Sequence, residues 1–401
     1  MTTTIKKISN MLLAFVMCAG PVITSCETAD PENPENPKNP ETPEIPTNII
    51  VFADDIVKKS CVEAFDTDGD GEVSYDEAAA VKDLSNVTLR FIDDFLTFDE
   101  FQYFINVKSI PDRLFIRCKY LKSIVLPQSI QTIGEYAFSQ CTGLKKIKLP
   151  QSLKTIDRAA FKNCTSLTEI ELLQGLETIG FDVFRGCTGL IDIKLPEGLQ
   201  TIDDTAFAEC SNLKNIKFPS TLTSIGQGAF LSCTSLINIK LPQGLQTIKD
   251  NAFEGCTSLE SLNLLELVFY TSIKNGTFKN CTSLKEIWLP QNLHLIAEYA
   301  FSECSRLTKV VFPEGLSTIW EYAFNKCSSL DNIEFPQGLE RIKSDAFTNC
   351  TKLTTITING AQGELSIGSG AFCDYGKTCS LKNIHIKRLV PPTNIINGKD
   401  H

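Results

Sequence analysis

The sequence has few of the residues on which catalytic and redox sites most often depend. Among its 401 residues there are only three histidines, His294, His385 and His401. A Ser-His-Asp or Cys-His unit would have to be assembled around one of them, and the sequence shows no pattern that does so. No C-x-x-C segment occurs, which argues against a redox motif of that type. These absences favour a binding protein over an enzyme.

The N-terminal apolar stretch, residues 11–23, is too short to span a bilayer. Lys6 and Lys7 precede it, and it runs into the sequence Ile-Thr-Ser-Cys that ends at Cys26. This arrangement is typical of a signal peptide, and its end resembles a lipobox, in which the chain is cut before a cysteine that is then acylated. We predict a signal peptide over residues 1–25, lipidation of Cys26, and a location at the bacterial outer membrane or cell surface. An ordinary cleavage site beside an unmodified Cys26 is the alternative.

Cysteine, in contrast, is abundant and periodic. From residue 118 to residue 256 a cysteine recurs every 23 residues, and after one step of 25 the period resumes from residue 281 to residue 350. Around each cysteine the same unit returns, L-x-x-I-x-L-P-x-x-L-x-x-I-x-x-x-A-F-x-x-C. A fixed period of this length with Leu and Ile at these spacings indicates a leucine-rich-repeat solenoid.

Energetics supports the same fold class. Ordering 23 residues costs roughly 35 kcal/mol at about 1.5 kcal/mol per residue. The six or so apolar side chains of one coil return only about 10–15 kcal/mol when buried. One coil is therefore unstable alone, and stacked coils bury each apolar set against the next. We expect about 12 coils, with a parallel sheet on the concave face whose first strand covers residues 121–126 and whose last covers residues 381–386.

The unit L-P followed by I-G and A-F-x-x-C resembles the BspA-like (treponemal-type) leucine-rich repeats of bacterial surface proteins, over about residues 106–388. The solenoid with its caps is expected over residues 96–390, followed by a tail at 391–401. The segment before the first full unit resembles a capping half-coil, with Ile110 aligned to Ile133. Leu173 and Leu265 replace the proline of the unit, and two residues are inserted near Phe269.

The cysteine ladder is expected to consist of buried free thiols. Side chains in register on parallel coils lie about 4.8 Å apart, whereas the Cβ atoms of a disulfide lie about 3.8 Å apart. Thiols at these positions fill small core sites and donate weak hydrogen bonds to loop carbonyls. Cys61 is expected in a helix core, and Cys373 and Cys379, outside the ladder, are candidates for a disulfide.

A proline-rich spacer over residues 26–50 leads to a segment, residues 51–95, that contains a calcium-loop pattern. The twelve residues from 66 to 77, DTDGDGEVSYDE, resemble an EF-hand loop. Such a loop supplies oxygen ligands at positions 1, 3, 5, 7, 9 and 12, with glycine at position 6. The resemblance implies a set of six ligands: Asp66, Asp68, Asp70, the main-chain carbonyl of Glu72, Ser74, and Glu77.

Helices are expected on both sides of this loop, with Ile56, Val62 and Phe65 on one face of the first and residues 78–84 in the second. Only one loop of this kind is present, so calcium is expected to be structural and to seal the end of the solenoid. The alternative is an acidic turn that caps a helix without a metal ion.

Charge is unevenly distributed along the chain. Residues 1–100 contain 20 acidic and 7 basic side chains, so the solenoid is nearly neutral although the whole chain carries −10. Alternate residues of each strand are expected to point outward on the concave face. One of these outward positions carries a basic strip with an aromatic beyond it, made of Lys148, Lys194, Lys217, Lys240 and Trp288.

Two hypotheses of different class follow. The first is a monomeric adhesion protein whose concave face binds a host extracellular-matrix or bacterial surface protein, as the family resemblance implies. The second is a glycan-binding accessory lipoprotein that uses Trp288. A nucleic-acid partner is not expected, since the basic strip is short and lacks interleaved aromatics. The lysines are equally consistent with a solvated face that has no ligand.

Overall fold

The computed structural model describes residues 48–85, 87, 94–359, 365–373 and 379–387. The predicted signal peptide, Cys26 and nearly all of the proline-rich spacer lie outside these residues, as does the predicted tail. Within the described residues no helix is long and apolar enough to cross a membrane.

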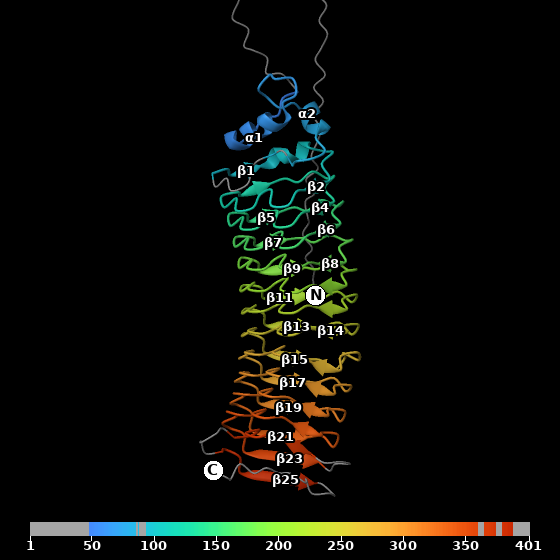
Figure 1. Ribbon diagram of the computed structural model, residues 1–401, viewed down its shortest axis with the longest axis vertical. Coiled ribbons are helices and arrows are strands. Elements are labelled where there is room, and N and C mark those ends of the chain that lie inside the picture. The colour runs from blue at the N-terminus through green and yellow to red at the C-terminus, as the bar shows by residue number, and fades with distance from the viewer. Residues whose placement is uncertain (1–47, 86, 88–93, 360–364, 374–378, 388–401) are drawn as a thin grey trace, which may run out of the picture. The chain divides into compact units, whose positions relative to one another are not determined.

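The repeats form a parallel β-solenoid, as the period predicted, with the coils stacked in chain order (Figure 1). Each full coil contributes two short strands, so two rows of strands run along the stack. The first row corresponds to the predicted sheet. It consists of β1 Thr97–Phe98, β3 Ser123–Ile124, β5 Lys146–Ile147, β7 Glu169–Ile170, β9 Asp192–Lys194, β11 Asn215–Lys217, β13 Asn238–Lys240, β15 Ser261–Asn263, β17 Glu286–Trp288, β19 Lys309–Val311, β21 Asn332–Phe335, β23 Thr355–Asn359 and β25 Asn383–Lys387.

The first row begins one strand earlier than expected. β1 pairs with β3 through Thr97 and Ser123, so the row has thirteen strands among the described residues rather than twelve. A 3-10 helix, η1 Asp99–Tyr103, follows β1. The predicted alignment of Ile110 with Ile133 is confirmed by their pairing.

A second row of strands, which was not predicted, is formed by the Thr-Ile segments of the repeat. Its members are β2 Ser109–Ile110, β4 Thr132–Ile133, β6 Thr155–Ile156, β8 Thr178–Ile179, β10 Thr201–Ile202, β12 Ser224–Ile225, β14 Thr247–Ile248, β16 Ser272–Ile273, β18 Leu295–Ile296, β20 Thr318–Ile319, β22 Arg341–Ile342 and β24 Ser366–Ile367. The row is interrupted between β6 and β8 and between β14 and β16. Both interruptions fall at coils in which Leu173 or Leu265 replaces the proline, whose fixed φ restricts the turn in other coils.

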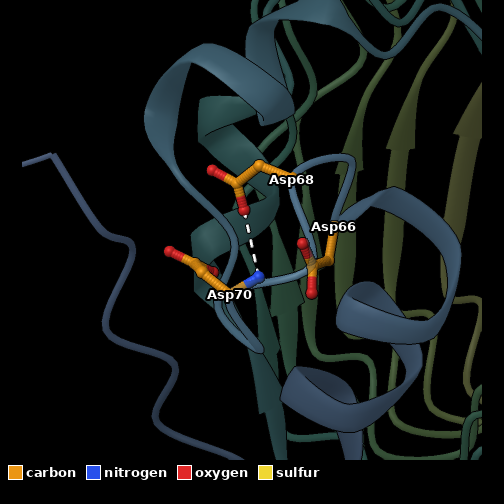
Figure 2. Close-up of side chains that lie close together, drawn as sticks. All are labelled: Asp66, Asp68 and Asp70. Atoms are coloured by element: carbon orange, nitrogen blue, oxygen red, sulfur yellow. Dashed lines mark hydrogen bonds between the residues drawn. The ribbon is translucent and has the colours of Figure 1, made fainter.

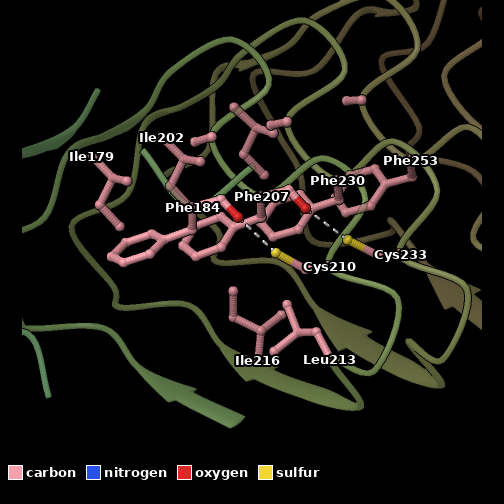
Figure 3. Close-up of a cluster of buried hydrophobic side chains, with 14 of the residues drawn as sticks. Ile179, Phe184, Ile202, Phe207, Cys210, Leu213, Ile216, Phe230, Cys233 and Phe253 are labelled. Carbon is pink, nitrogen blue, oxygen red and sulfur yellow. Dashed lines mark hydrogen bonds between the residues drawn. The ribbon is translucent and has the colours of Figure 1, made fainter. Parts of the chain in front are cut away.

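The core contains a continuous stack of phenylalanines. From Phe115 to Phe372, successive coils place their phenylalanine rings face to face with centroids 5.0–5.7 Å apart. Figure 3 shows part of this stack, from Phe184 to Phe253, beside Ile202 of the second row. Because every ring packs against the coil before and the coil after it, the stack ties the coils to one another.

The cysteines of the ladder are free, buried thiols that donate hydrogen bonds between coils. The Sγ of Cys210 donates to the carbonyl of Phe184 at 3.1 Å, and that of Cys233 donates to the carbonyl of Phe207 at the same distance (Figure 3). Burial raises the pKa of the Cys187 thiol to about 12, as it does for Cys256 and Cys304. The ladder therefore has a packing role, as the spacing predicted.

We expect the ladder thiols to be unreactive in the native protein, because they are buried and the thiolate is disfavoured. A thiol-reactive dye at pH 8 should label none of the eleven ladder cysteines between Cys118 and Cys350 in the native state and all of them in denaturant. Detection of fewer than about six in non-reducing denaturant would mean that most are paired, contrary to this structure.

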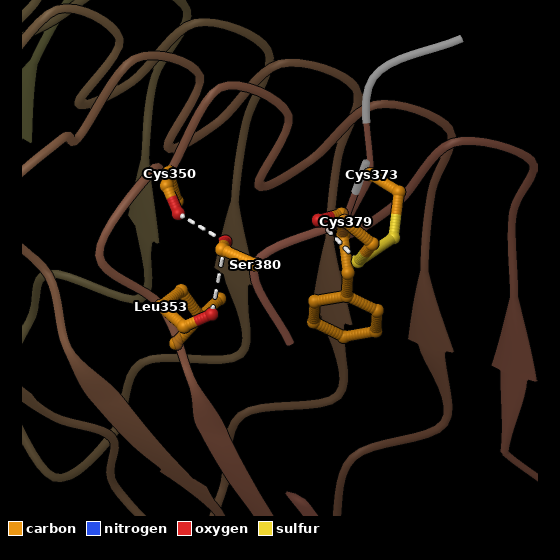
Figure 4. Close-up of a disulfide and its surroundings, with 6 residues drawn as sticks. Cys350, Leu353, Cys373, Cys379 and Ser380 are labelled. Carbon is orange, nitrogen blue, oxygen red and sulfur yellow. Dashed lines mark hydrogen bonds between the residues drawn. A yellow bond between two sulfur atoms is a disulfide. The ribbon is translucent and has the colours of Figure 1, made fainter. Parts of the chain in front are cut away.

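Cys373 and Cys379 form a disulfide near the last described coil (Figure 4). Beside it, the hydroxyl of Ser380 donates to the carbonyls of Cys350 and Leu353, at 3.2 and 3.1 Å. These bonds attach the segment that leads into β25 to the preceding coil.

Candidate functional site

The predicted calcium loop lies between two helices, α1 Asp55–Phe65 and α2 Tyr75–Ala80. The buried face of α1 consists of Val57, Cys61 and Phe65, spaced four residues apart, whereas Ile56 and Val62 are only partly buried. All three residues predicted for one face, Ile56, Val62 and Phe65, therefore pack against the core, but the centre of the buried face lies at Val57 and Cys61. The second helix is also shorter than predicted, since it ends at Ala80.

The three aspartates of the loop converge. Carboxylate oxygens of Asp66, Asp68 and Asp70 all lie within 4.8 Å of one another, as Figure 2 shows. The loop shape that brings them together depends on Gly69 and Gly71, whose φ angles are +78° and +84°. Three carboxylates at this separation, two of them exposed and that of Asp66 partly buried, could hold a metal ion.

Backbone amides complete the shape of the loop. The amides of Gly69 and Gly71 donate to the two carboxylate oxygens of Asp66 at 2.7 and 2.9 Å. The amide of Asp70 donates to Asp68 Oδ1 at 3.1 Å, the dashed line in Figure 2. These hydrogen bonds hold the three aspartates together in the loop.

Glu77 does not join the three aspartates. Its carboxylate accepts from the amide and hydroxyl of Thr67 at 2.6 and 2.8 Å, and from the amide and hydroxyl of Ser74 at 2.9 Å each. Desolvation raises the pKa of the Glu77 carboxyl, but these four hydrogen bonds outweigh it and lower that pKa to about 2. Glu77 and Ser74 form a capping box on α2, so Glu77 closes the loop by capping.

The remaining loop positions have other partners. The side chain of Glu72 pairs with Lys58 at 2.7 Å. Its main-chain carbonyl, which the pattern implies as a ligand, stays a prediction. Val73 is fully buried, and its carbonyl accepts the amide of Ile50 at 2.9 Å. Ile49 and Ile50, assigned to the spacer from the sequence, therefore pair with the loop as a partner strand would.

The loop and its helices pack on the first coil. The amide of Ala53 donates to Glu100 at 2.9 Å, and the amide of Leu96 donates to Asp54 at 2.8 Å. Phe65 packs edge-on against Phe104, with ring centroids 5.5 Å apart. These contacts make the helices and loop, residues 48–85, a cap on the stack, which we call the N-terminal cap.

The second candidate site is the outward face of the first row, where the predicted register of the basic strip is confirmed. Lys194, Lys217 and Lys240 occupy directly paired positions on β9, β11 and β13. Their neighbours along the stack are also as predicted, since Lys148 pairs with Val125 and Trp288 pairs with Asn263 and Val311.

The strip is less basic than its sequence implied. Lys194 approaches Glu171, its neighbour across the coils, at 3.9 Å, and Lys146 is paired with Glu169 at 2.6 Å. Among the described residues, Lys217 and Lys240 have no ion-pair partner. These two lysines line an open groove of about 840 Å³ together with Asn215 and Asn238, and Glu197 and Glu266 lie on the turn side of it.

Aromatic side chains beside the second row, of which Tyr299 and Trp320 are exposed and Tyr322 is partly buried, were not predicted from the sequence. The rings of Tyr299 and Tyr322 stack with centroids 5.1 Å apart, and Lys343 Nζ lies 5.9 Å from the centre of the exposed Trp320 ring. Trp320 follows the Thr-Ile pair of its coil at a position where Gly134, Asp157 and most other coils have a small or charged residue. That departure from the repeat was the signal available in the sequence.

The stacked coils and their two rows of short parallel strands define a repeat solenoid. The family model described as the BspA type leucine rich repeat region matches residues 94–190, 154–270 and 271–392. The chain therefore belongs to the BspA-type leucine-rich-repeat family.

Solved structures include several similar proteins. A leucine-rich-repeat protein from Bacteroides ovatus is 35% identical, with a TM-score of 0.64 and coverage of 70% of each chain. A leucine-rich cell surface protein from Faecalibacterium prausnitzii is 27% identical, with a TM-score of 0.40 and coverage of 64% of this chain and 84% of that one. The Treponema pallidum leucine-rich-repeat protein is 30% identical, with a TM-score of 0.37 and coverage of 50% and 83%. Among curated proteins, none matches this chain.

Proposed function

We propose that this chain is an exported, lipid-anchored surface protein whose first-row face binds a protein partner. One observation carries the proposal: Lys217 and Lys240 are exposed, in register and without an ion-pair partner among the described residues, beside an open groove. The family of bacterial surface-type repeats and the signal-peptide pattern before Cys26 support the location. A binding role, and not catalysis, agrees with the scarcity of histidine.

Replacement of Lys194, Lys217 and Lys240 together with glutamate should abolish binding of a protein partner and the salt dependence of that binding. The charge of the face is reversed, while all three side chains are exposed, so the melting temperature should change little. Binding of soluble chain from residue 48 onward to extracellular-matrix proteins and polysaccharides would measure the effect. Replacement of Lys154 and Lys352, exposed lysines at other positions of the coil, with glutamate is the control. Unchanged binding by the triple variant would mean that the strip is a solvated face without a ligand.

A glycan is the second candidate ligand, and one observation favours it. Trp320 and Tyr299, which stacks on the partly buried Tyr322, add exposed aromatics at the second row to Trp288 of the first row. Aromatic side chains present the large apolar surface that a sugar ring can cover. In the polysaccharide arm of the same experiment, Trp288→Ala and Trp320→Ala should each weaken binding if sugars are the ligand.

We also propose that the loop from Asp66 to Glu77 binds calcium and that the ion stabilises the N-terminal cap. The convergence of three carboxylates supports the proposal, since calcium takes six to eight hard oxygen ligands. Binding of the full set requires Glu77 to give up its hydrogen bonds to Thr67.

A further inference from the structure

We infer that the first-row face between β11 and β19 recognises a protein segment that carries carboxylates at one end and large apolar side chains at the other. The inference rests on the proposed protein-binding function and names the chemistry of the partner. The apolar end is the turn around Phe269, where two residues are inserted relative to the repeat unit.

The basic end of this face is built from two strands. Asn215 and Lys217 of β11 lie directly beside Asn238 and Lys240 of β13, so two amides and two ammonium groups repeat at the strand spacing of about 4.8 Å. No acidic residue stands on the outward positions of these two strands. A carboxylate pair in the partner could therefore approach the lysines from solvent, while Glu197 and Glu266 on the turn side of the groove favour hydrogen-bond donors there.

The apolar end is the turn of the longer coil. In other coils this turn reads Pro-x-x-Leu with polar residues between, as at residues 196–199 and 242–245. Here Leu267 and Tyr270 are buried, while Val268 and Phe269 between them are 55% and 61% exposed. The buried pair fixes the turn, so the two apolar side chains are held in solvent rather than folded into the core.

These two side chains contribute little to the stability of the fold, because an apolar side chain stabilises a protein by being buried and these stay largely in water. Clustered exposed apolar residues in a soluble protein mark interaction sites. Leu265, Trp288 and Val311 are also exposed nearby, and Trp288 and Val311 are paired neighbours on β17 and β19.

Backbone and side-chain contacts connect the coil of the insert with the groove and with β17. Glu266 of the insert lines the groove and accepts the side-chain amide of Gln243 at 3.2 Å. The amide of Leu264 donates to the carbonyl of Trp288 at 2.8 Å. Lys240 and Trp288 are two coils apart, which corresponds to about 10 Å. An extended segment covers that distance in about three residues at roughly 3.3 Å each.

A selection from random twelve-residue peptides on phage tests this inference on the exported chain carrying Cys26→Ser. Enriched peptides should contain two acidic residues and, three to five positions away, a large apolar residue. Synthetic versions should bind at least tenfold more weakly to Lys217→Gln/Lys240→Gln and to Val268→Ser/Phe269→Ser. Lys154→Gln/Lys352→Gln should bind as the parent does, and melting temperatures confirm that all variants fold.

The outcomes separate this inference from the proposed function. Enriched peptides that bind every variant equally, or that lack acidic residues, would overturn the inference and leave protein binding in place. Failure to enrich any peptide, together with binding of a polysaccharide panel by the same protein, would overturn both.

Discussion

Replacement of Phe230 with alanine should lower the free energy of unfolding by about 3–5 kcal/mol, the range for a phenylalanine removed from a packed core. The ring of Phe230 is fully buried and stacks on Phe207 and Phe253 with centroids 5.3 Å away on each side. Loss of the ring leaves a cavity between the neighbouring coils. The coils cannot move together to fill it, because backbone hydrogen bonds from Phe207 to Ala229 and from residue 230 to Ala252 fix their spacing.

Phe269→Ala is the matched control for this experiment. The same atoms are deleted from a side chain that is largely exposed, so the change should stay within about 0.5 kcal/mol. Urea unfolding followed by circular dichroism would compare the two variants with the parent. Equal stability of Phe230→Ala and the parent would contradict the account of the stack as the tie between coils.

The repeat period was sufficient to predict the first row and its register. Once the cysteines fixed the coil length, the positions of the strands from β3 onward followed, which is why Lys194, Lys217 and Lys240 could be placed side by side from the sequence. The stacking of the phenylalanines from Phe115 to Phe347 follows from the same argument, since each of them stands three residues before a ladder cysteine.

Departures from the period could not be predicted in this way. β1 lies in a segment without the repeat unit, and Thr97 and Phe98 adopt strand geometry only because the coil of Ser123 stacks against them. The centre of the buried face of α1 could not be located in this way, because its partner surface, including Phe104, lies about 40 residues away in the chain. The weakening of the basic strip depends on Glu171, whose approach to Lys194 is a matter of side-chain position.

For the candidate metal site, the sequence pattern located the three aspartates but did not predict that Glu77 caps α2. A spacing rule gives the position of each oxygen donor, and Asp66, Asp68 and Asp70 lie where the rule puts them. The spacing rule says nothing about the competing role of Glu77 as a helix cap, because that role depends on the conformation of Ser74.

Calcium should raise the melting temperature of the protein and protect the N-terminal cap and first coil from protease. At a hundredfold excess over the dissociation constant, a bound ligand stabilises the native state by about 2.7 kcal/mol. The effect should be local, because coupling in a solenoid acts mainly between neighbouring coils. Cleavage between Phe65 and Ile110 should slow with calcium, whereas the coil of Cys350 should barely respond.

Three variants make this prediction specific to the loop. Asp68→Asn keeps an Oδ1 acceptor for the amide of Asp70 but removes a charge from the cluster, so it should weaken calcium binding at little cost to the loop. Glu77→Gln should abolish both the stabilisation and the protection by calcium. The melting temperature of this variant without calcium shows how much the capping box of α2 contributes to stability. Asp76→Asn removes a carboxylate that accepts from Asn48 and is not a predicted ligand, so it is the control for charge alone.

Titration calorimetry on the chain from residue 26 onward, carrying Cys26→Ser, tests whether the loop binds calcium. Extracellular calcium modules bind with dissociation constants up to roughly millimolar, so a test at about 5 mM reaches a weak site. Heat of binding that Asp68→Asn reduces and Asp76→Asn leaves intact would support the site. If no heat appears, or if all variants bind equally, Glu77 serves only as the cap of α2, and the aspartates form a turn that their own amide hydrogen bonds hold together. The N-terminal cap would then be attached to the first coil by contacts that need no ion, such as those of Phe65 and Glu100.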